Sequence, residues 1–195
     1  MTASNAPSDV SPTPDQLERI AAAATGKREQ RKQIDMGHYG IRIAADGTWY
    51  HQGAPFTRLS LVKLFATVLH RDEDGGYSLR TPVEHGKITV DDAPFTIVEA
   101  WYDDAASPEM TSRRLNLRTN IDRIVTAGPD HRIRVVTDAE TGEPRPYIDT
   151  GNGLDALILR PVFYDLVDQA ESLERDGGTV LGLWSDGVFH ELGTL

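Results

Sequence analysis

Apolar and polar residues follow two different periods along this chain, and the periods separate predicted strands from predicted helices. Alternating runs such as Ile41–Ile43 and Phe95–Tyr102 predict half-buried strands, because successive side chains of a strand point to opposite faces. Residues 58–70 and 161–173 instead repeat apolar residues at helical spacing and predict amphipathic helices. Asp-Gly pairs, as at Asp46-Gly47, predict tight hairpins between strands.

One predicted unit occurs twice. The segment from Arg58 to Gly76 recurs without a gap 102 residues later, from Arg160 to Gly178, and both copies end in Asp-Gly-Gly. Six positions are identical between residues 58–84 and 160–186, so chance similarity of two amphipathic helices is the alternative. Because helix, turn and strand coincide together, we interpret the segment as a repeat.

The predicted fold is α+β, with two similar halves that each hold an antiparallel sheet or partial barrel and one amphipathic helix. We assign residues 34–104 to the first half and residues 105–195 to the second, with the boundary in the polar loop at residues 103–113. Residues 1–33 are expected to form a flexible tail and an N-terminal helix.

Composition narrows the class of protein. The chain has 195 residues, a net charge of −10 and no cysteine, which excludes disulfides and thiolate metal sites. No apolar run approaches the ~18 residues of a membrane helix and no signal peptide is visible, so we expect a cytoplasmic protein. Acidic residues dominate residues 36–104 and 146–195, which argues against nucleic acid and anionic membranes as partners.

An arginine opens both copies of the repeat. Arg58 and Arg160 each precede a predicted helix, and Pro161 places Arg160 at the cap position. A cation there opposes the helix dipole, so each arginine requires a compensating carboxylate or an anionic ligand. The alternative is an arginine that braces the loop through backbone carbonyls.

A group of polar residues flanks one predicted strand. Glu84-His85 and Asp91-Asp92 offer oxygen and imidazole ligands for a divalent metal, or a base and its orienting partner. The alternative is a solvated hairpin end. None of the six histidines has a metal-ligand spacing to another, so we predict no metal site and no cofactor.

The middle of the chain is rich in arginine. Arg114, Asn116 and Arg118 alternate with leucines and share one face of a predicted strand, where guanidinium groups suit a carboxylate or a phosphate. Cross-strand pairing with nearby acidic residues is the alternative.

Two segments are specific enough to suggest a relationship, Thr81-Pro-Val-Glu84 and Asp91-Asp-Ala-Pro-Phe95. Others are Asp46-Gly-x-Trp49, Arg58 with Leu61-Val-x-Leu-Phe65, Thr119-Asn120, Pro146-Tyr147, Gly153-Leu-x-Ala156, Arg160 and Trp184-Ser-x-Gly187. From about residue 34 the chain thereby resembles an uncharacterised bacterial family, the domain of unknown function 1285. The resemblance implies two similar α+β halves and a role in signal transduction or ligand sensing, and it assigns no reaction.

Our leading hypothesis is a cytoplasmic, non-catalytic module that binds a small polar or anionic ligand in a cleft between the halves, as a monomer or a homo-oligomer. One alternative is a metal-assisted hydrolase with Glu84, His85, Asp91 and Asp92 within about 5 Å of a shared point. Another is a protein-interaction scaffold. The predicted ligand-binding residues are Arg58, Thr81, Glu84, Asp91, Asp92, Arg118, Asn120, Tyr147 and Arg160.

Overall fold

The structure is a computed structural model that describes residues 15, 18, 19, 22, 33–103, 111, 113–175 and 178–194. The expected N-terminal helix lies outside the described residues apart from four isolated positions, and so do residues 176–177 of the second Asp-Gly-Gly. The chain divides into two compact units, Met1–Asp91 and Asp92–Leu195. Within the described ranges no helix is long and apolar enough to cross a membrane.

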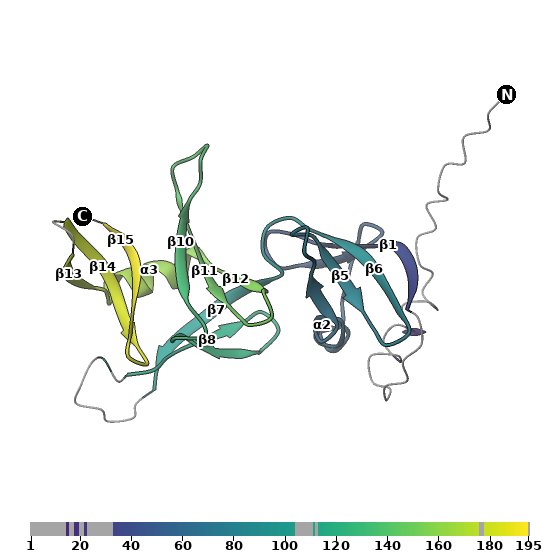
Figure 1. Ribbon diagram of the computed structural model, residues 1–195, viewed down its shortest axis with the longest axis horizontal. Coiled ribbons are helices and arrows are strands. Elements are labelled where there is room, and N and C mark those ends of the chain that lie inside the picture. The colour runs from purple at the N-terminus through teal and green to yellow at the C-terminus, as the bar shows by residue number, and fades with distance from the viewer. Residues whose placement is uncertain are drawn as a thin grey trace. The chain divides into compact units, whose positions relative to one another are not determined.

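The first unit is a mixed six-stranded sheet with one helix (Figure 1). Its strands lie in the order β3-β2-β1-β6-β5-β4, and all neighbours are antiparallel except the central pair β1 and β6. In chain order the elements are β1 (Ile34–Ile43), β2 (Trp49–His51), β3 (Ala54–Pro55), α2 (Leu59–Ala66), β4 (Leu69–Arg71), β5 (Tyr77–Arg80) and β6 (Glu84–Val90).

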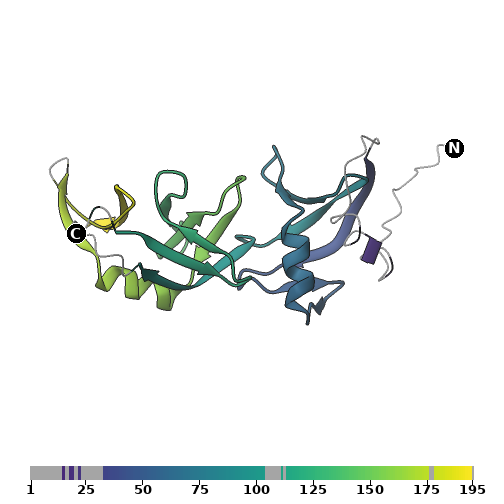
Figure 2. The same cartoon turned by 90° about the horizontal axis from the view of Figure 1, so that it is seen from below.

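Aromatic rings join α2 to this sheet, and Figure 2 shows the helix lying across one of its faces. Trp49 of β2 stacks on Phe65 of α2 with ring centroids 6.5 Å apart, and Phe56 meets both rings edge-on. The buried helix residues are Val62 and Phe65, one turn apart, as amphipathic spacing predicts. The predicted amphipathic helix is therefore confirmed, but α2 ends at Ala66, before the expected limit at residue 70, because the chain turns there into β4.

The junction between β1 and β6 is closed. The Ile34 N–H donates to the Val83 carbonyl, and the Asp91 N–H donates to the Ile43 carbonyl, both at 2.9 Å. In between, the Tyr39 ring lies on Gly86, where an added Cβ would come within 2.6 Å of the ring. A glycine at this position lets the two strands and the ring approach one another.

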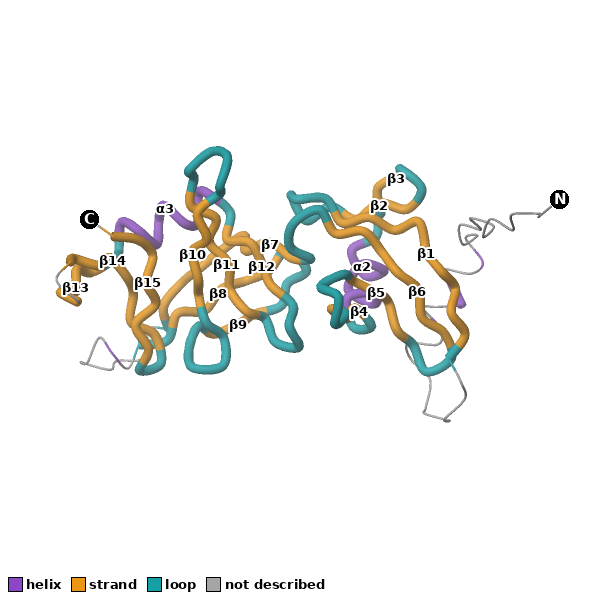
Figure 3. The backbone as a smooth tube through the Cα atoms, turned by 45° about the horizontal axis from the view of Figure 1, so that its top comes forward, coloured by secondary structure: helices purple, strands orange, loops and turns teal. Residues whose placement is uncertain are grey.

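The second unit contains a mixed six-stranded sheet, a three-stranded sheet and a helix (Figure 3). The larger sheet has the order β10-β11-β12-β7-β8-β9, with β7 and β12 parallel, and the smaller has the order β13-β14-β15. The elements are β7 (Phe95–Tyr102), β8 (Leu115–Thr119), β9 (Ile124–Thr126), β10 (Ile133–Thr137), β11 (Pro144–Asp149), β12 (Asp155–Ile158), α3 (Arg160–Asp168), β13 (Glu171–Arg175), β14 (Gly178–Ser185) and β15 (Val188–Thr194).

The two units share one sequence of elements. Three strands joined by hairpins (β1–β3 or β10–β12) lead into a helix (α2 or α3), and three more strands follow (β4–β6 or β13–β15). The predicted pair of similar halves is therefore present. The second unit differs by the addition of β7, β8 and β9.

The structural repeat is not gapless, in contrast to the sequence alignment. Residue Arg58 caps α2, but the residue that caps α3 is Leu159, and Arg160 already belongs to the helix. The buried Val62 and Phe65 of α2 correspond in the same way to Phe163 and Leu166. The helix α3 is one residue longer than α2, and this additional residue accounts for the shift between the structural repeat and the sequence alignment. The expectation that Arg160 occupies the cap position was wrong.

Two further expectations need revision. The protein is mostly β, and each six-stranded sheet includes one parallel pair, so the sheets are mixed rather than purely antiparallel. The division between the units lies at Asp91 and Asp92, earlier than the expected boundary at residues 104 and 105. The reason is β7, which pairs with β8 and β12 of the second unit.

Candidate functional site

The edge of β10 opposite β11 is unpaired within the described part of the chain, because β10 is the last strand of its sheet. The Asp149 N–H donates to the Arg132 carbonyl, and the Asp138 N–H donates to the Glu143 carbonyl. The backbone N–H and carbonyl groups of the even-numbered residues of β10 are therefore directed toward β11. Backbone groups alternate along a strand, so those of Val135 and Thr137 face the other way. Their antiparallel partners on β11 are Pro146 and Pro144, which lack an N–H.

The edge of β15 opposite β14 is also unpaired among the described residues, and it lies beside β10 (Figure 3). A two-residue turn at Asp186 and Gly187, both with positive φ, joins β14 to β15, and the register of the two strands shifts between Leu181 and Gly182. Phe189 packs on Trp184, with ring centroids 5.3 Å apart.

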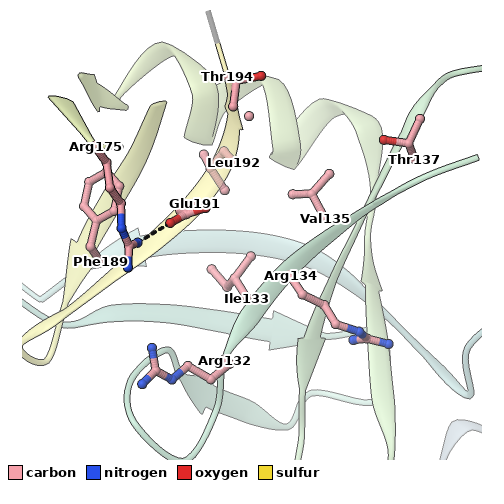
Figure 4. Close-up of a pocket in the computed structure, with 11 residues that line it drawn as sticks. Arg132, Ile133, Arg134, Val135, Thr137, Arg175, Phe189, Glu191, Leu192 and Thr194 are labelled. Carbon is pink, nitrogen blue, oxygen red and sulfur yellow. Dashed lines mark hydrogen bonds and ion pairs between the residues drawn. The ribbon is translucent and has the colours of Figure 1, made fainter. Parts of the chain in front are cut away.

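The space between these two edges is a groove of about 490 Å³ (Figure 4). Ile133 and Val135 of β10 and Phe189 and Leu192 of β15 supply its apolar surface. Ile133 and Leu192 are buried, whereas Thr137 and Thr194 at the far ends of the strands are exposed. The groove therefore has an apolar base and an open, polar end.

Arginine predominates among the charged residues of this groove. It is lined by Arg132, Arg134 and Arg175 against a single acidic residue, Glu191, in a chain whose net charge is −10. Arg175 forms an ion pair with Glu191, the contact dashed in Figure 4. The two terminal nitrogens of Arg134 donate to the two carboxylate oxygens of Asp155, each at 2.9 Å. Arg132 is exposed and has no carboxylate partner among the described residues.

One buried histidine connects the two edges. The Ile133 N–H donates to Nδ1 of His190 at 3.2 Å, so the proton of the neutral imidazole is on Nε2. His190 is only 1% exposed, and Nε2 has no partner within the described chain. Burial, with a smaller contribution from Arg132, lowers the pKa of His190 to about 4. The side chain is therefore neutral near pH 7.

The predicted ligand-binding residues lie in both units and do not form one cluster within either. In the first unit, Thr81 is part of a turn, where its Oγ1 accepts the Glu84 N–H at 3.1 Å and donates to the Glu84 carbonyl at 3.0 Å. Asp91 accepts a hydrogen bond from Nε of Arg42 at 2.9 Å. Arg58 is exposed and lines a pocket of about 280 Å³ beside α2, without an ion pair among the described residues.

In the second unit, contacts between β8, the turn that follows it and β7 account for two of the predicted residues. Nε of Arg118 donates to Glu99 at 2.7 Å, which is the alternative that the sequence left open. The Oδ1 atom of Asn120 accepts the Thr96 N–H at 3.3 Å and so links β8 to β7. Arg160 forms an exposed ion pair with Glu143. None of these three lines the groove.

Asp92 and Tyr147 do come together, around an arginine. The Tyr147 hydroxyl donates to Asp92 at 2.7 Å, and Arg145 donates to the Tyr147 oxygen at 3.0 Å and to Asp92 at 2.5 Å. The bonds with Tyr147 and Asp92 raise the pKa of Arg145 further. Every group in this set is satisfied, so it serves as a brace between β11 and the start of the unit.

The four residues of the alternative hypothesis, a metal-assisted hydrolase, are not brought to one point. Glu84 and Asp91 lie at opposite ends of β6, a strand of seven residues, and a strand rises about 3.3 Å per residue. Among the described residues no group of three or more histidine and acidic side chains is placed to hold a metal ion. The arrangement required by the hydrolase hypothesis is absent from these residues.

A larger polar depression of about 840 Å³ lies on the first unit, around Asp72. Burial raises the pKa of Asp72, but hydrogen bonds from Lys87, Ser78 and Arg80 outweigh it and lower that pKa to about 2. Nζ of Lys87 also reaches Asp74 at 2.9 Å. Asp72 is paired with Arg80 and Lys87, whereas Arg132 in the groove of the second unit has no carboxylate partner among the described residues.

Family models match almost the whole described chain. Residues 30–93 match the N-terminal domain of unknown function of DUF1285, and residues 94–192 match the C-terminal domain of the DUF1285 proteins of unknown function. The chain belongs to the DUF1285 family. The limit between the two family domains agrees closely with the division of the structure at Asp91 and Asp92. No match was found among curated proteins.

Two solved structures of DUF1285 proteins resemble this one. A family member from Silicibacter pomeroyi DSS-3 is 38% identical, with a TM-score of 0.77, and the match covers 92% of this chain and 95% of the other. A member from Shewanella baltica OS155 is 28% identical, with a TM-score of 0.51 over 67% of this chain and 91% of the other. The comparisons establish family and fold and assign no ligand.

The sequence showed that the middle of the chain is rich in arginine, but it did not place Arg132 and Arg134 at a groove. One signal was available. Pro144 and Pro146 alternate along β11, which shows that the neighbouring residues of β10 have backbone groups directed elsewhere. The unpaired edge of β15 left no comparable signal in the sequence.

Proposed function

We propose that this DUF1285 protein is a cytoplasmic, non-catalytic binding module with a role in signal transduction, and that its second unit binds a polar, anionic ligand between β10 and β15. The observation that carries the proposal is the groove itself. It joins an apolar base to three arginines, one of which has no partner among the described residues. Such a combination suits a ligand that has both apolar and negatively charged groups.

A thermal-shift screen tests this proposal with citrate, glutamate and inorganic phosphate at millimolar concentration. A ligand present at 100 times its Kd stabilises the folded state by about 2.7 kcal/mol, which is readily detected as an increase in Tm. We expect at least one anion to raise the Tm of the wild-type protein.

The matched variants are Arg132→Ala and Arg114→Ala, since both remove an exposed arginine from the second unit but only Arg132 lines the groove. Arg132→Ala should lose most of the ligand-induced shift, and Arg114→Ala should keep it. An equal shift in all three proteins would place the binding elsewhere and contradict the proposal.

A further inference from the structure

We infer that the ligand of the groove is an extended acidic peptide, which pairs as an additional strand with the free edge of β10. This inference rests on the proposed function and specifies its ligand. An unpaired strand edge offers a row of backbone donors and acceptors, and proteins recognise extended peptides by adding them to such edges. Four observations support the inference for this protein.

The first observation is the direction of the backbone groups. The ladder with β11 leaves the N–H and carbonyl groups of Val135 and Thr137 on the groove side. The Ile133 N–H on the same side is already bound to His190, so pairing by an incoming strand begins beyond it. Two consecutive outward-facing residues, Val135 and Thr137, can pair with about three or four residues of a peptide strand.

The second observation is the comparison with the first unit. There, β1 pairs with β2 on one side and with β6 on the other. Its counterpart β10 pairs with β11 on one side, and on the other side no described strand is bound to it. A peptide strand would therefore complete on β10 the arrangement that β1 already has.

The third observation is the apolar base. Side chains of a bound strand alternate between two faces, and on one face they would meet Val135 together with Leu192 across the groove. Apolar residues at alternate positions of the peptide, with β-branched residues preferred, suit this face because such cross-strand pairs stabilise sheets.

The fourth observation is charge. The intervening peptide side chains would point to the face of Arg132, which has no carboxylate partner among the described residues. Because pairing begins beyond Ile133, the glutamate or aspartate nearest to Arg132 can accept a bidentate hydrogen bond from its guanidinium. Alternating apolar and acidic residues are therefore the expected sequence pattern.

The experiment uses the full chain and a capped peptide of about eight residues, the length of an ordinary strand, with valine and glutamate in alternation. A peptide in which lysine replaces glutamate is the control. We expect the acidic peptide to bind and the basic one to bind at least about tenfold more weakly. On binding, the amides of Val135 and Thr137 should exchange with solvent more slowly, whereas those of Arg134 and Val136, already bonded to β11, should change little.

Two matched variants isolate the backbone contact. Val135→Pro removes an N–H from the groove side of β10, and Ile124→Pro removes one from β9, at the opposite edge of the same sheet. Proline is tolerated at such edges because the lost N–H has no partner in the ladder. Val135→Pro should bind the peptide about fivefold more weakly or worse, and Ile124→Pro should bind it like the wild type.

The outcomes separate this inference from the function on which it rests. Peptide binding without slower exchange at Val135 and Thr137 would overturn strand addition and leave an anion-binding groove. Stabilisation by small anions with no peptide binding would do the same. A concentration-dependent dimer that protects Val135 in the absence of peptide would assign the edge to a second copy. No response to peptide or anion would overturn both proposals.

Discussion

The two units use the same order of elements but treat their central junction in opposite ways. In the first unit β1 and β6 are hydrogen-bonded neighbours in one sheet. In the second, the corresponding β10 and β15 are the end strands of separate sheets, with a groove of about 490 Å³ between them. Similar local sequence can therefore build the same elements while leaving an opening where the other copy is sealed.

One pair of equivalent residues differs in kind at this junction. Gly86 lies two residues after Glu84, which flanks the turn between β5 and β6. His190 occupies the same place in the second unit, two residues after Val188. Gly86 admits the Tyr39 ring to the junction, whereas the imidazole of His190 stands between β15 and the Ile133 N–H. A side chain at this position replaces direct contact between the strand backbones.

The largest effect is expected from breaking the core of the closed unit. Trp49→Ala removes a 2% exposed ring that stacks on Phe65, and such truncations reduce the free energy of unfolding by about 3–5 kcal/mol. Urea unfolding followed by circular dichroism measures this loss. Ile124→Ala, at a side chain that is 57% exposed, is the control and should change it little. A loss below about 1 kcal/mol in Trp49→Ala would contradict the assigned core.

Lowering the pH should reduce the stability of the two units over different pH ranges. The pKa of His190 is about 4 in the folded protein and near 6.5 when unfolded, so the unfolded chain binds more protons between these values. The second unit should keep its full stability above pH 6.5 and lose on the order of 3 kcal/mol as the pH falls to 4. In the first unit, partial burial and the charge of Arg80 lower the pKa of His70, so a small loss is expected below pH 6.5. The loss that comes from Asp72, whose pKa falls from 3.8 to about 2, should begin below about pH 4.

The amide signals of each unit, followed during an acid titration, measure how much stability each unit loses at a given pH. His190→Asn keeps an acceptor near the position of Nδ1 but does not titrate, so it should remove the loss between pH 6.5 and 4. Identical acid profiles for the wild type and His190→Asn would show that another group controls the second unit.

The junction itself can be tested with two glycines. Gly86→Ala would place a Cβ 2.6 Å from the Tyr39 ring, and overpacking of this kind reduces stability by about 1–3 kcal/mol. Gly193→Ala on β15 meets nothing within 4 Å and should change stability by less than about 0.5 kcal/mol. Similar urea midpoints for the two variants would contradict the difference between a closed junction at β6 and an open one at β15.

A smaller effect is expected at the brace of the second unit. Tyr147→Phe removes the hydroxyl that donates to Asp92 at 2.7 Å and should reduce stability by about 1 kcal/mol. Tyr164→Phe, at a ring that is 58% exposed, is the control. Equal stability of the two variants in urea would indicate that Arg145 and Asp92 suffice without the hydroxyl.

The smallest effect is expected at the two repeat arginines. Arg58 is exposed without an ion pair among the described residues, and Arg160 forms only an exposed pair with Glu143. Both alanine variants should retain stability to within about 0.5 kcal/mol. A loss above 1 kcal/mol in either variant would restore the arginines as structural anchors.

The sequence predicted local structure well because short-range physics determines it. The helical spacing of Val62 and Phe65 and the two-residue turn at Asp186 and Gly187 each depend on residues that are only a few positions apart. The predictions that failed depended on residues that are far apart in the sequence. Nothing near β7 indicates that it pairs with β12, and that pairing moved the boundary between the units.

The candidate site could be predicted only in its composition. The arginine-rich middle was visible in the sequence, but which arginine would lack a partner depended on pairing over long distances, as between Arg134 and Asp155. The repeat arginines were overvalued because a single inserted residue in α3 separates Arg160 from the place that Arg58 occupies. A gapless alignment cannot show such a shift.

Amide hydrogen exchange in the free protein tests the central contrast most directly. The Asp91 N–H, which donates to Ile43 across the sealed junction at 2.9 Å, should exchange slowly. The amides of Val135 and Thr137 should exchange at rates close to those of an unstructured chain, while Val136 between them is protected by β11. Slow exchange at both Val135 and Thr137 would mean that the edge of β10 is already paired, and the groove would not be available to a ligand.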